Sequence, residues 1–176
     1  MSETTTRRKP LNSTAASLLG FLHEGPMSGW DLTNTAQERI GDFWTITQSQ
    51  VYRELAAMDT AGLVEKGAVG ARDRTPYQIT ASGREAFHEW ISRDPGAETI
   101  RVPLLLTLAF GDHLEPGHRD RIIAANREIH QKRLDGYLAQ EQMEMPPHLR
   151  ATLAFGITYE RGVLEWFERL PHLLAD

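Results

Sequence analysis

The sequence predicts a mostly helical protein with one small β-hairpin. Apolar residues recur at helical spacing between residues 13 and 62, and turn-forming residues divide this stretch into three segments. Between residues 63 and 80 the pattern changes to two short runs typical of strands, joined by a polar turn. Helical spacing returns near residue 81 and continues almost to the end of the chain. We therefore expect three helices, a hairpin, a fourth helix and an all-helical second half.

Residues that cap helices predict the ends of the first three helices. The first helix is expected to begin near Ser13. Ser28, with Asp31 three residues later, has the pattern of a capping box and predicts the start of the second helix. Thr47 is the expected N-cap of the third helix, and Gly62 is expected to end it.

The hairpin is expected to follow the third helix directly. Its strands are predicted over residues 63–69 and 75–80, with a turn that contains glycine between them. Pro76 has no N–H to donate, so the second strand is expected to be an edge strand at that point. Ser82 and Glu85 form a second capping-box pattern and predict the start of the fourth helix. The buried side of that helix is expected to comprise Phe87, Trp90 and Ile91.

This order of elements is that of a winged helix-turn-helix domain, in which the hairpin forms the wing. We expect a flexible basic arm over residues 1–12, the winged-helix domain over residues 13–93 and an all-helical dimerisation domain over residues 94–176. An Asp-Pro-Gly sequence at residues 94–96 marks the boundary between the two domains. Helices of the second domain are expected over about residues 101–112, 116–142 and 147–170.

The composition limits the classes of function. The chain of 176 residues has a net charge of −5, and its second half is more acidic than its nearly neutral first half. It has no cysteine, which excludes disulfides and thiolate metal sites and suits a cytoplasmic protein. The seven histidines include no pair at helical metal-ligand spacing, and neither a nucleophile motif nor a phosphate-binding glycine loop occurs. We therefore expect no enzyme activity, no metal, no cofactor and no membrane segment.

Candidate DNA contacts come from the third helix, the wing and the arm. On a helical wheel, Ser49 and Arg53 point away from the apolar Val51, in the part of the helix where major-groove contacts are made. The wing and the arm carry basic residues that suit phosphate contact. The expected DNA-binding residues are Gln48, Ser49, Gln50, Tyr52 and Arg53 of the helix, Arg72 and Arg74 of the wing, and Arg7, Arg8 and Lys9 of the arm. The alternative interpretation of each set is a solvated polar surface.

An apolar stripe along the last helix predicts a dimer interface. Its spacings alternate between three and four residues, as in a coiled-coil seam. The expected interface residues are Leu149, Leu153, Gly156, Tyr159, Val163, Trp166 and Leu170 on the last helix, with Ile122 and Ile129 on the helix before it. The stripe can also form the core of the helical domain itself, and the two interpretations are compatible.

Four aromatic residues are candidates for lining an effector pocket, although aromatic residues at helical spacing are more often core. They are Trp44, Trp90, Tyr159 and Trp166. A small-molecule effector is expected to bind near Trp90, because this residue lies just before the segment that joins the two domains.

Several short motifs occur in a fixed order along the chain. In the first domain they are LLGFL at residues 18–22, GPMSGWDL at 25–32, VYREL at 51–55, GLVE at 62–65 and YQITASGR at 77–84. They resemble motifs of PadR-family transcriptional regulators. In the second domain, residues 105–112, 159–161 and 164–166 are similar to the longer C-terminal domain of the virulence-activator-like PadR subfamily. The sequence departs from the family at Gln48-Ser49-Gln50, where a proline and small residues are common, so the operator sequence stays open.

The resemblance implies a homodimeric repressor that binds double-stranded DNA at an inverted-repeat operator and is released by a small-molecule effector. Two alternatives remain. One is a winged-helix module that binds another protein instead of DNA, which the weak basic charge of residues 1–93 slightly favours. The other is a hydrolase without a recognised motif, against which the missing nucleophile argues.

Overall fold

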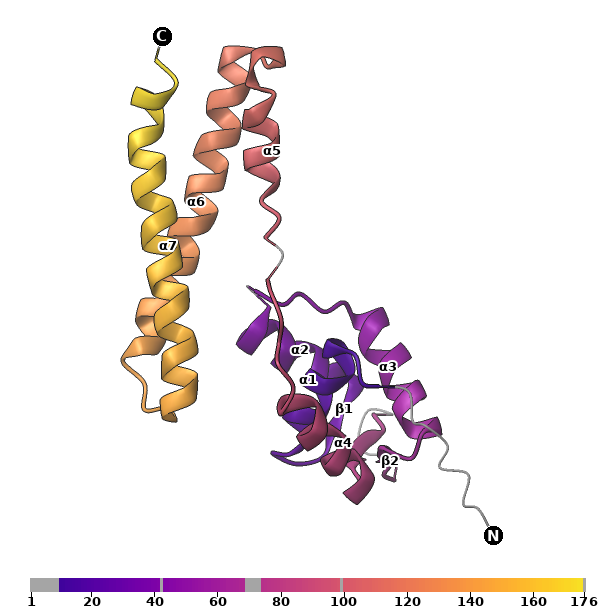
Figure 1. Cartoon of the computed structure of the whole chain (residues 1–176). Coiled ribbons are helices and arrows are strands. Elements are labelled where there is room, and N and C mark those ends of the chain that lie inside the picture. The colour runs from indigo at the N-terminus through magenta and orange to yellow at the C-terminus, as the bar shows by residue number, and fades with distance from the viewer. Residues whose placement is uncertain (1–9, 42, 69–73, 99, 176) are drawn as a thin grey trace. The chain divides into compact units, whose positions relative to one another are not determined.

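The computed structural model describes residues 10–41, 43–68, 74–98 and 100–175. The chain divides into two compact units, Met1–Ala97 and Glu98–Asp176. Both units are mainly helical and the first also contains a small antiparallel sheet, so the predicted fold class is confirmed (Figure 1). Within the described ranges, no helix is long and apolar enough to cross a lipid bilayer.

The first unit has the element order of a winged helix. Its helices are α1 (Ser13–Leu22), α2 (Gly29–Ile40), α3 (Gln48–Thr60) and α4 (Ala81–Ile91), and its strands are β1 (Met27–Ser28), β2 (Val64–Lys66) and β3 (Pro76–Ile79). The predicted order of three helices, two hairpin strands and a fourth helix is confirmed. The additional strand β1 was not expected, because two residues are too few to show a strand period.

Local caps fix the ends of α2 and α3. Ser28 and Asp31 form the predicted capping box at the start of α2. Thr47 is the N-cap of α3 as predicted, and Gln50 completes a capping box with it. Gly62, just beyond α3, has a φ of 69°, a left-handed conformation that favours glycine and ends the helix.

The start of α4 differs from the prediction. The N-cap is Thr80, whose side chain accepts a hydrogen bond from the Gly83 N–H at 3.0 Å. The expected capping box of Ser82 and Glu85 is therefore wrong. The Thr80 hydroxyl also donates to the Gly62 carbonyl at 2.8 Å, and this long-range bond favours a helix start that a local pattern cannot reveal.

The sheet has the strand order β1-β3-β2, with antiparallel neighbours. Met27 pairs with Tyr77 on one side of β3, and Lys66 pairs with Tyr77 on the other. The expectation that Pro76 lies on an edge strand is wrong, because β1 covers that edge. The central strand tolerates this proline since it is the first residue of the strand, and its carbonyl still accepts a hydrogen bond from the Gly67 N–H at 2.8 Å.

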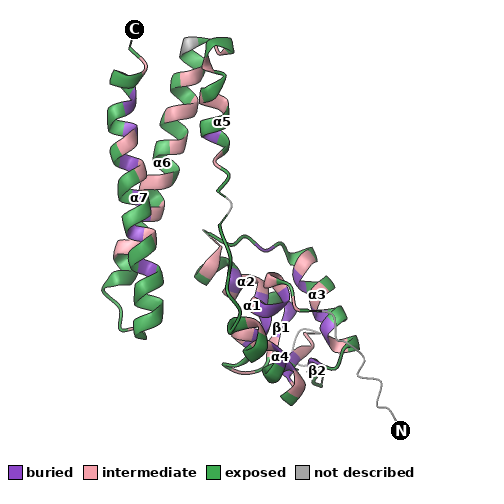
Figure 2. Ribbon diagram, viewed as in Figure 1, coloured by how far each residue is buried: buried purple, intermediate pink, exposed green. Residues whose placement is uncertain are grey.

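The core of the first unit lies where α1, α2, α3 and the sheet face one another (Figure 2). Its largest fully buried side chains are Leu18, Leu19, Leu22, Leu32, Val51, Leu55 and Val64. Because three helices and the sheet all contribute to one core, the position of α3 relative to the wing is fixed by packing.

α4 approaches this core through small residues. Gly83 lies so close to the chain after α3 that a Cβ there would be 2.1 Å from the Leu63 carbonyl oxygen. Ala86 is buried, and Phe87 packs against the core from its edge. The predicted burial of Ile91 is wrong: its side chain is 57% exposed, because α4 meets the core near its start and Ile91 is its last residue. Trp90 is half-buried.

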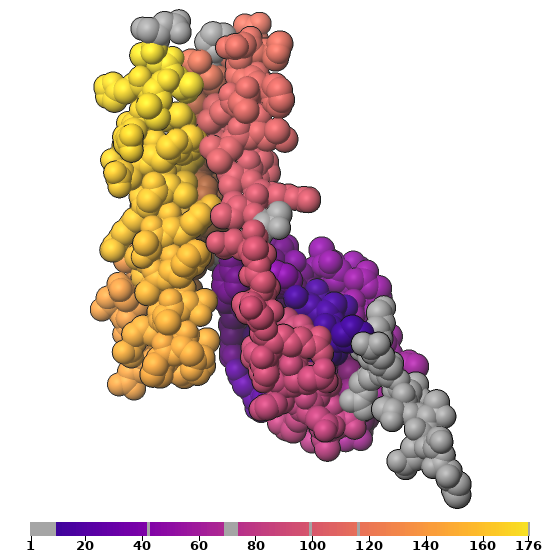
Figure 3. All heavy atoms as spheres, viewed as in Figure 1, coloured from indigo at the N-terminus to yellow at the C-terminus, as the bar shows by residue number. Residues whose placement is uncertain are grey.

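The second unit contains the three predicted helices. They are α5 (Pro103–Ala109), α6 (Pro116–Glu141) and α7 (Pro147–Leu173), with a short 3₁₀ helix, η2 (Gly111–His113), after α5. Buried residues recur along one side of α7, which packs against α6 and α5 (Figure 2). They are Leu153, Ile157, Glu160, Leu164, Phe167 and Leu170. The segment 92–98 between the units is exposed throughout and lies at the surface in Figure 3.

A buried carboxylate joins α6 to α7. The Glu160 side chain is only 3% exposed, and its Oε2 lies 2.5 Å from Nδ1 of His130. Its other oxygen lies 4.0 Å from Nη1 of Arg133. The His130 ring also packs against Phe167, with 5.8 Å between the ring centroids. Unlike the apolar contacts around it, this hydrogen bond can form in only one alignment of the two helices. It therefore specifies how α6 and α7 align.

Replacing Glu160 by alanine is expected to lower the free energy of unfolding of the helical unit by about 1–3 kcal/mol, because a mostly buried ring nitrogen of His130 loses its partner. Urea unfolding followed by circular dichroism measures this loss. The matched control is Glu165→Ala, which removes an exposed carboxylate from the same helix and is expected to cost less than about 0.5 kcal/mol. Equal losses in the two variants would contradict the structural role of Glu160.

Candidate nucleic-acid interface

α3 turns a polar face to solvent. Its apolar face, formed by Val51, Leu55 and Met58, is buried in the core, so the opposite face points outward. The exposed residues in its N-terminal half are Gln48, Ser49, Tyr52 and Arg53. The Arg53 side chain is 66% exposed. This face supplies the hydrogen-bond donors and acceptors that recognition of base edges in the major groove requires.

Gln50 uses its side-chain oxygen inside the protein. Oε1 accepts hydrogen bonds from the Thr47 N–H at 2.8 Å and from the Thr47 hydroxyl at 3.0 Å. A base contact by this oxygen would break the capping box. Gln50 thus uses this oxygen to hold the start of α3, and its predicted contact with DNA stays a prediction.

Glu54 holds Arg53 and ties it to the start of α1. The guanidinium of Arg53 donates to Oε1 of Glu54, with Nη2 at 3.2 Å. Oε2 of Glu54 accepts a hydrogen bond from Nδ2 of Asn12 at 3.0 Å. Asn12 also caps α1, because its Oδ1 accepts a hydrogen bond from the Ala15 N–H at 2.8 Å. With the Glu54 side chain only 12% exposed, this chain of bonds limits the positions that Arg53 adopts.

Tyr52 connects α3 to the start of α2. Its ring lies against Gly29, where a Cβ would be 2.6 Å from the ring carbon Cε1. Only glycine at this position lets the ring pack so closely. Tyr52 nevertheless remains 45% exposed, so part of its side chain is accessible from solvent.

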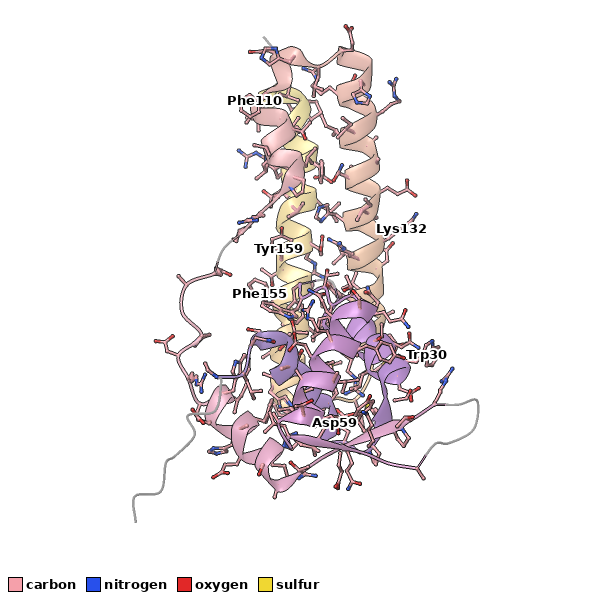
Figure 4. The ribbon with its side chains drawn as sticks, turned by 90° about the vertical axis from the view of Figure 1, so that its right-hand side faces the viewer. Trp30, Asp59, Phe110, Lys132, Phe155 and Tyr159 are labelled. Carbon is pink, nitrogen blue, oxygen red and sulfur yellow. The ribbon has the colours of Figure 1, made fainter. Side chains whose placement is uncertain are left out.

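Arg74, at the base of the second hairpin strand, folds back onto α2. Its guanidinium carbon lies 4.0 Å from the centroid of the Trp30 ring, in a cation–π contact. Its Nη1 lies 3.5 Å from Oδ1 of Asp31. Trp30 itself is exposed, and it is labelled in Figure 4. The sequence did not reveal this contact, because Trp30 and Arg74 are far apart along the chain.

A small polar cavity lies between these elements. It has a volume of about 180 Å³ and is lined by Ser28, Gly29, Tyr52, Arg74, Thr75 and Tyr77. Residues of α2, α3 and β3 thus line one space, and they include serine, threonine, tyrosine and arginine. This chemistry suits a phosphate oxygen, which accepts hydrogen bonds from hydroxyl and guanidinium donors.

Asp31 is a stable anion beside this cavity. The Ser28 hydroxyl, which lies 2.6 Å from Oδ2 of Asp31, lowers the pKa of the Asp31 carboxyl below its usual value, and burial partly opposes this effect. The Ser28 N–H and the charge of Arg74 lower the pKa further. The carboxylate therefore partly neutralises Arg74, and a phosphate has to compete with it.

Some predicted DNA contacts cannot be placed. Arg72 of the wing and Arg7, Arg8 and Lys9 of the arm lie outside the described residues. The structure therefore brings together the residues of α3 with Arg74, whereas the arm and the wing tip stay predictions.

The predicted dimer stripe occupies two environments in the helical unit. Leu153 and Leu170 are buried within the unit, and Gly156 packs against the Tyr137 ring, where a Cβ would be 2.8 Å from Cε2. Val163, Trp166 and Ile122 are partly buried against the same unit. Leu149, Tyr159 and Ile129 are exposed and remain available for a partner.

Phe155, which the sequence analysis missed, lies beside Tyr159. The two rings are stacked, with 6.4 Å between their centroids, on one side of α7 (Figure 4). The Phe155 side chain is 66% exposed. Its position outside the regular stripe hid it from the spacing argument. An exposed aromatic pair on a long helix is a candidate protein contact.

The aromatic residues predicted to line an effector pocket are divided between the two units. Trp44 is exposed and Trp90 half-buried in the first unit. In the second unit, Tyr159 is exposed and Trp166 packs against Phe167. No group of histidine and acidic side chains in the described part of the chain could hold a metal ion.

Comparisons with known protein families match both halves of the chain. Residues 18–89 match the transcriptional regulator PadR-like family, and residues 100–175 match the virulence activator alpha C-terminal family. The chain is 35% identical to a probable transcriptional regulator, Rv1176c, of Mycobacterium tuberculosis, over 91% of this chain and 96% of that protein. It is 32% identical over 98 residues to the negative transcriptional regulator PadR of Bacillus subtilis, an alignment that spans 53% of this chain and 54% of that protein.

Solved structures share the fold. A structure of B. subtilis PadR in complex with operator DNA has a TM-score of 0.77 at 22% identity, covering 94% of this chain and 100% of that chain. A structure of the same protein in complex with p-coumaric acid has a TM-score of 0.70 at 22% identity, covering 92% of this chain and 98% of that chain. At this level of identity the likeness establishes the fold.

Asp31→Asn is expected to destabilise the protein at pH 7 by roughly 0.5–2 kcal/mol, the usual range for a lost helix cap. The pKa of Asp31 is lower in the folded chain than its unfolded value of 3.8, so the carboxylate stabilises the fold above that pH. This contribution is lost as the pH falls through the folded pKa, because the carboxyl of the parent then takes up a proton.

Urea midpoints of the parent and Asp31→Asn, measured from pH 7 to pH 3, test this dependence. The difference between them should shrink toward the acidic end. Glu38→Gln, which changes an exposed carboxylate on the same helix, is the control and should show no such trend. A difference for Asp31→Asn that stays constant with pH would refute the role of the ionised carboxylate.

Proposed function

Because this chain belongs to the PadR-like family of transcriptional regulators, we propose that it is a homodimeric repressor that binds an inverted-repeat operator and is released by a small molecule. The family consists of DNA-binding regulators and not of enzymes. The observation that carries the proposal is the exposed polar face of α3, held on a winged-helix core, where Arg53 donates a hydrogen bond to Glu54. A regulator of this kind acts in the cytoplasm, beside the DNA.

Arg53 is the side chain best suited to read a base. It lies on the outward face of α3, and its guanidinium has several donors in a fixed plane, which can bind the edge of guanine with two hydrogen bonds. Gln48 and Ser49 lie about one turn earlier, in the part of a recognition helix that contacts bases. Together they form the proposed reading surface.

The polar cavity beside Arg74 supports a contact to the DNA backbone. It brings Tyr52, Arg74 and the first turn of α2 to one place. The positive end of the α2 dipole also favours an anion there, although Asp31 opposes it. A backbone contact at this cavity would set the orientation of α3 without selecting a sequence.

The exposed apolar side chains of the helical unit support a homodimer. Phe155 and Tyr159 form a stacked pair on α7. Further exposed apolar side chains are Leu105 and Leu106 of α5 and Phe110, which directly follows that helix. A symmetric pair of recognition helices needs two copies, and pairing through this unit would bury these side chains.

A small-molecule effector is supported by the B. subtilis PadR structure, which contains p-coumaric acid. An effector releases DNA only if it binds one conformation of the dimer better than the other. The repressor role that we propose for this chain is supported by its 32% identity, over 98 residues, to the negative transcriptional regulator PadR of B. subtilis.

Arg53→Ala is expected to weaken binding to the operator by about 1–3 kcal/mol per half-site and to relax the preference at one base position, because a base contact is lost. The operator is obtained by selecting bound sequences from random DNA. Affinities for operator and scrambled DNA are then measured across a salt series. Arg84→Ala, an exposed arginine of α4 outside α3 and the wing, serves as control and should bind both DNAs like the parent.

If Arg53→Ala keeps the affinity of the parent for both DNAs, α3 is not the reading element. Binding of a protein partner that is insensitive to salt, without binding to any selected DNA, would then favour the interaction module.

Phe155→Glu is expected to convert the full chain from dimer to monomer at micromolar concentration, because it places a charge in the proposed apolar interface. Light scattering measures the mass, and circular dichroism confirms that the helices remain. Ala154→Glu adds the same charge to an exposed neighbouring residue of α7 outside the aromatic pair and should leave the dimer intact. A monomeric parent would contradict the proposed assembly.

A further inference from the structure

Trp30 is a large exposed aromatic residue whose position the core does not explain. It is the second residue of α2, and its side chain is 46% exposed. Among the described residues, neither the core of the first unit nor the side chains packed against that core include Trp30. The structure does give its ring a contact with the guanidinium of Arg74. This contact is therefore the best indication of what Trp30 does.

The pairing of β1 with β3 brings Trp30 and Arg74 together. The two strands are antiparallel, and Ser28 at the end of β1 pairs with Pro76 at the start of β3. Continuing this order by two residues places Trp30 opposite Arg74. Although α2 begins before that point, the two side chains still meet, with 4.0 Å between the guanidinium carbon and the ring centroid. The sheet thus sets where the contact forms.

Two groups hold the guanidinium of Arg74, and the ring is the stronger of them. Nη1 lies 3.5 Å from Oδ1 of Asp31, which is longer than most hydrogen bonds between nitrogen and oxygen. The side chains of Arg74 and Asp31 are 34% and 44% exposed, and an ion pair in such a setting contributes little. Tryptophan is the best aromatic partner for a cation, and 4.0 Å is well inside the range of about 6 Å for this contact.

A contact with a ring leaves the guanidinium able to bind an anion. A guanidinium has five N–H donors in one plane, and an aromatic ring over that plane accepts none of their hydrogen bonds. Among the described residues, Arg74 donates one hydrogen bond, the long one to Asp31. Arg74 is therefore held beside the polar cavity that it lines, with donors left for an acceptor from outside the protein.

The size and charge of the cavity favour a phosphate group as this acceptor. Its volume of about 180 Å³ is below the range of about 300–1,000 Å³ for sites that enclose a whole small molecule. A single group of a larger molecule is the better match. The described residues that line the cavity include one cation, Arg74, and no carboxylate. A phosphate of the DNA backbone has the charge and the acceptor oxygens that these residues can bind.

We propose that Trp30 is a positioning residue for DNA binding: its ring holds the guanidinium of Arg74 at the polar cavity, where Arg74 binds one backbone phosphate in each half-site. This inference rests on the proposed function. Without the ring, Arg74 would sample more orientations, and the phosphate would have to order the side chain on binding. Trp30 thus acts on the affinity for DNA of any sequence, whereas Arg53 acts on the choice of sequence.

A double-mutant cycle tests whether Trp30 acts through Arg74. The affinities of the full-length parent, Trp30→Leu, Arg74→Gln and the double variant are measured for operator and scrambled DNA across a salt series. Trp30→Leu is expected to weaken binding to both DNAs alike, by about two- to fivefold per half-site, the range for an exposed cation–π contact. Arg74→Gln should lower the salt slope by about one unit per half-site. In that background Trp30→Leu should have no further effect, because the residue that it positions is gone.

Two further variants separate positioning from damage to the fold. Trp30→Tyr keeps an aromatic ring and should restore most of the affinity that Trp30→Leu loses. Arg39→Gln is the matched control, because Arg39 also belongs to α2, lies over the ring of Phe21 and pairs with Glu24, but does not line the cavity. It should keep the affinity and the salt slope of the parent. Circular dichroism confirms that each variant keeps its helices.

The proposal is overturned if Trp30→Leu binds both DNAs like the parent, or if it weakens binding equally with and without Arg74. A loss confined to the operator also overturns it, because a phosphate contact does not select a sequence. Operator binding by the parent together with any of these results refutes the positioning role and keeps the proposed function. If the parent binds neither DNA, the proposed repressor is refuted, and the positioning role with it.

Discussion

The packing of the winged unit depends on contacts that the first turn of α2 makes with the sheet, with α3 and with the hairpin. Ser28 belongs to β1 and so adds a strand to the wing, and it also begins α2 by capping it. Gly29 admits the ring of Tyr52, which fixes the distance between α2 and α3. Asp31 completes the cap and holds Arg74 at the base of the hairpin. Residues 28–31 thus connect the sheet, α3 and the base of the hairpin.

Features made within a few residues were predictable, and features made across the chain were not. The cap at Thr47 involves neighbours in sequence, so its pattern is visible in the sequence. The start of α4 depends on a bond to Gly62, and the place of Pro76 in the sheet depends on β1, which lies almost 50 residues earlier. The contact of Arg74 with Trp30 is equally distant in sequence. Periodicity shows that a helix has an apolar side, but not what will cover that side.

The long helix α7 illustrates this limit. Its buried side is set by packing on α6 and α5, while Phe155 and Tyr159 are apolar residues on a second, exposed side. The apolar stripe that residue spacing predicts for this helix therefore includes residues of the buried side and of the exposed side. Apolar contacts also permit helices to slide past one another, since they have little directional preference. The hydrogen bond between Glu160 and His130 opposes such sliding at one position. The apolar core of the unit thus holds the helices together, and this polar contact sets their alignment.

The bonds that join Asn12, Glu54 and Arg53 have a consequence for the entropy of DNA recognition. A free arginine side chain loses about 2 kcal/mol of rotamer entropy when a ligand fixes it. Here part of that ordering takes place when the chain folds, before any DNA is present. In the proposed contact, the Arg53 guanidinium would enter the DNA groove with fewer accessible orientations. A base pair at the right position would then be bound with a smaller loss of entropy, and a displaced one would not be reached by simple rotation of the side chain. Selectivity for the operator would then come partly from side-chain entropy that Arg53 loses when the protein folds, and not only from the contacts that form on binding.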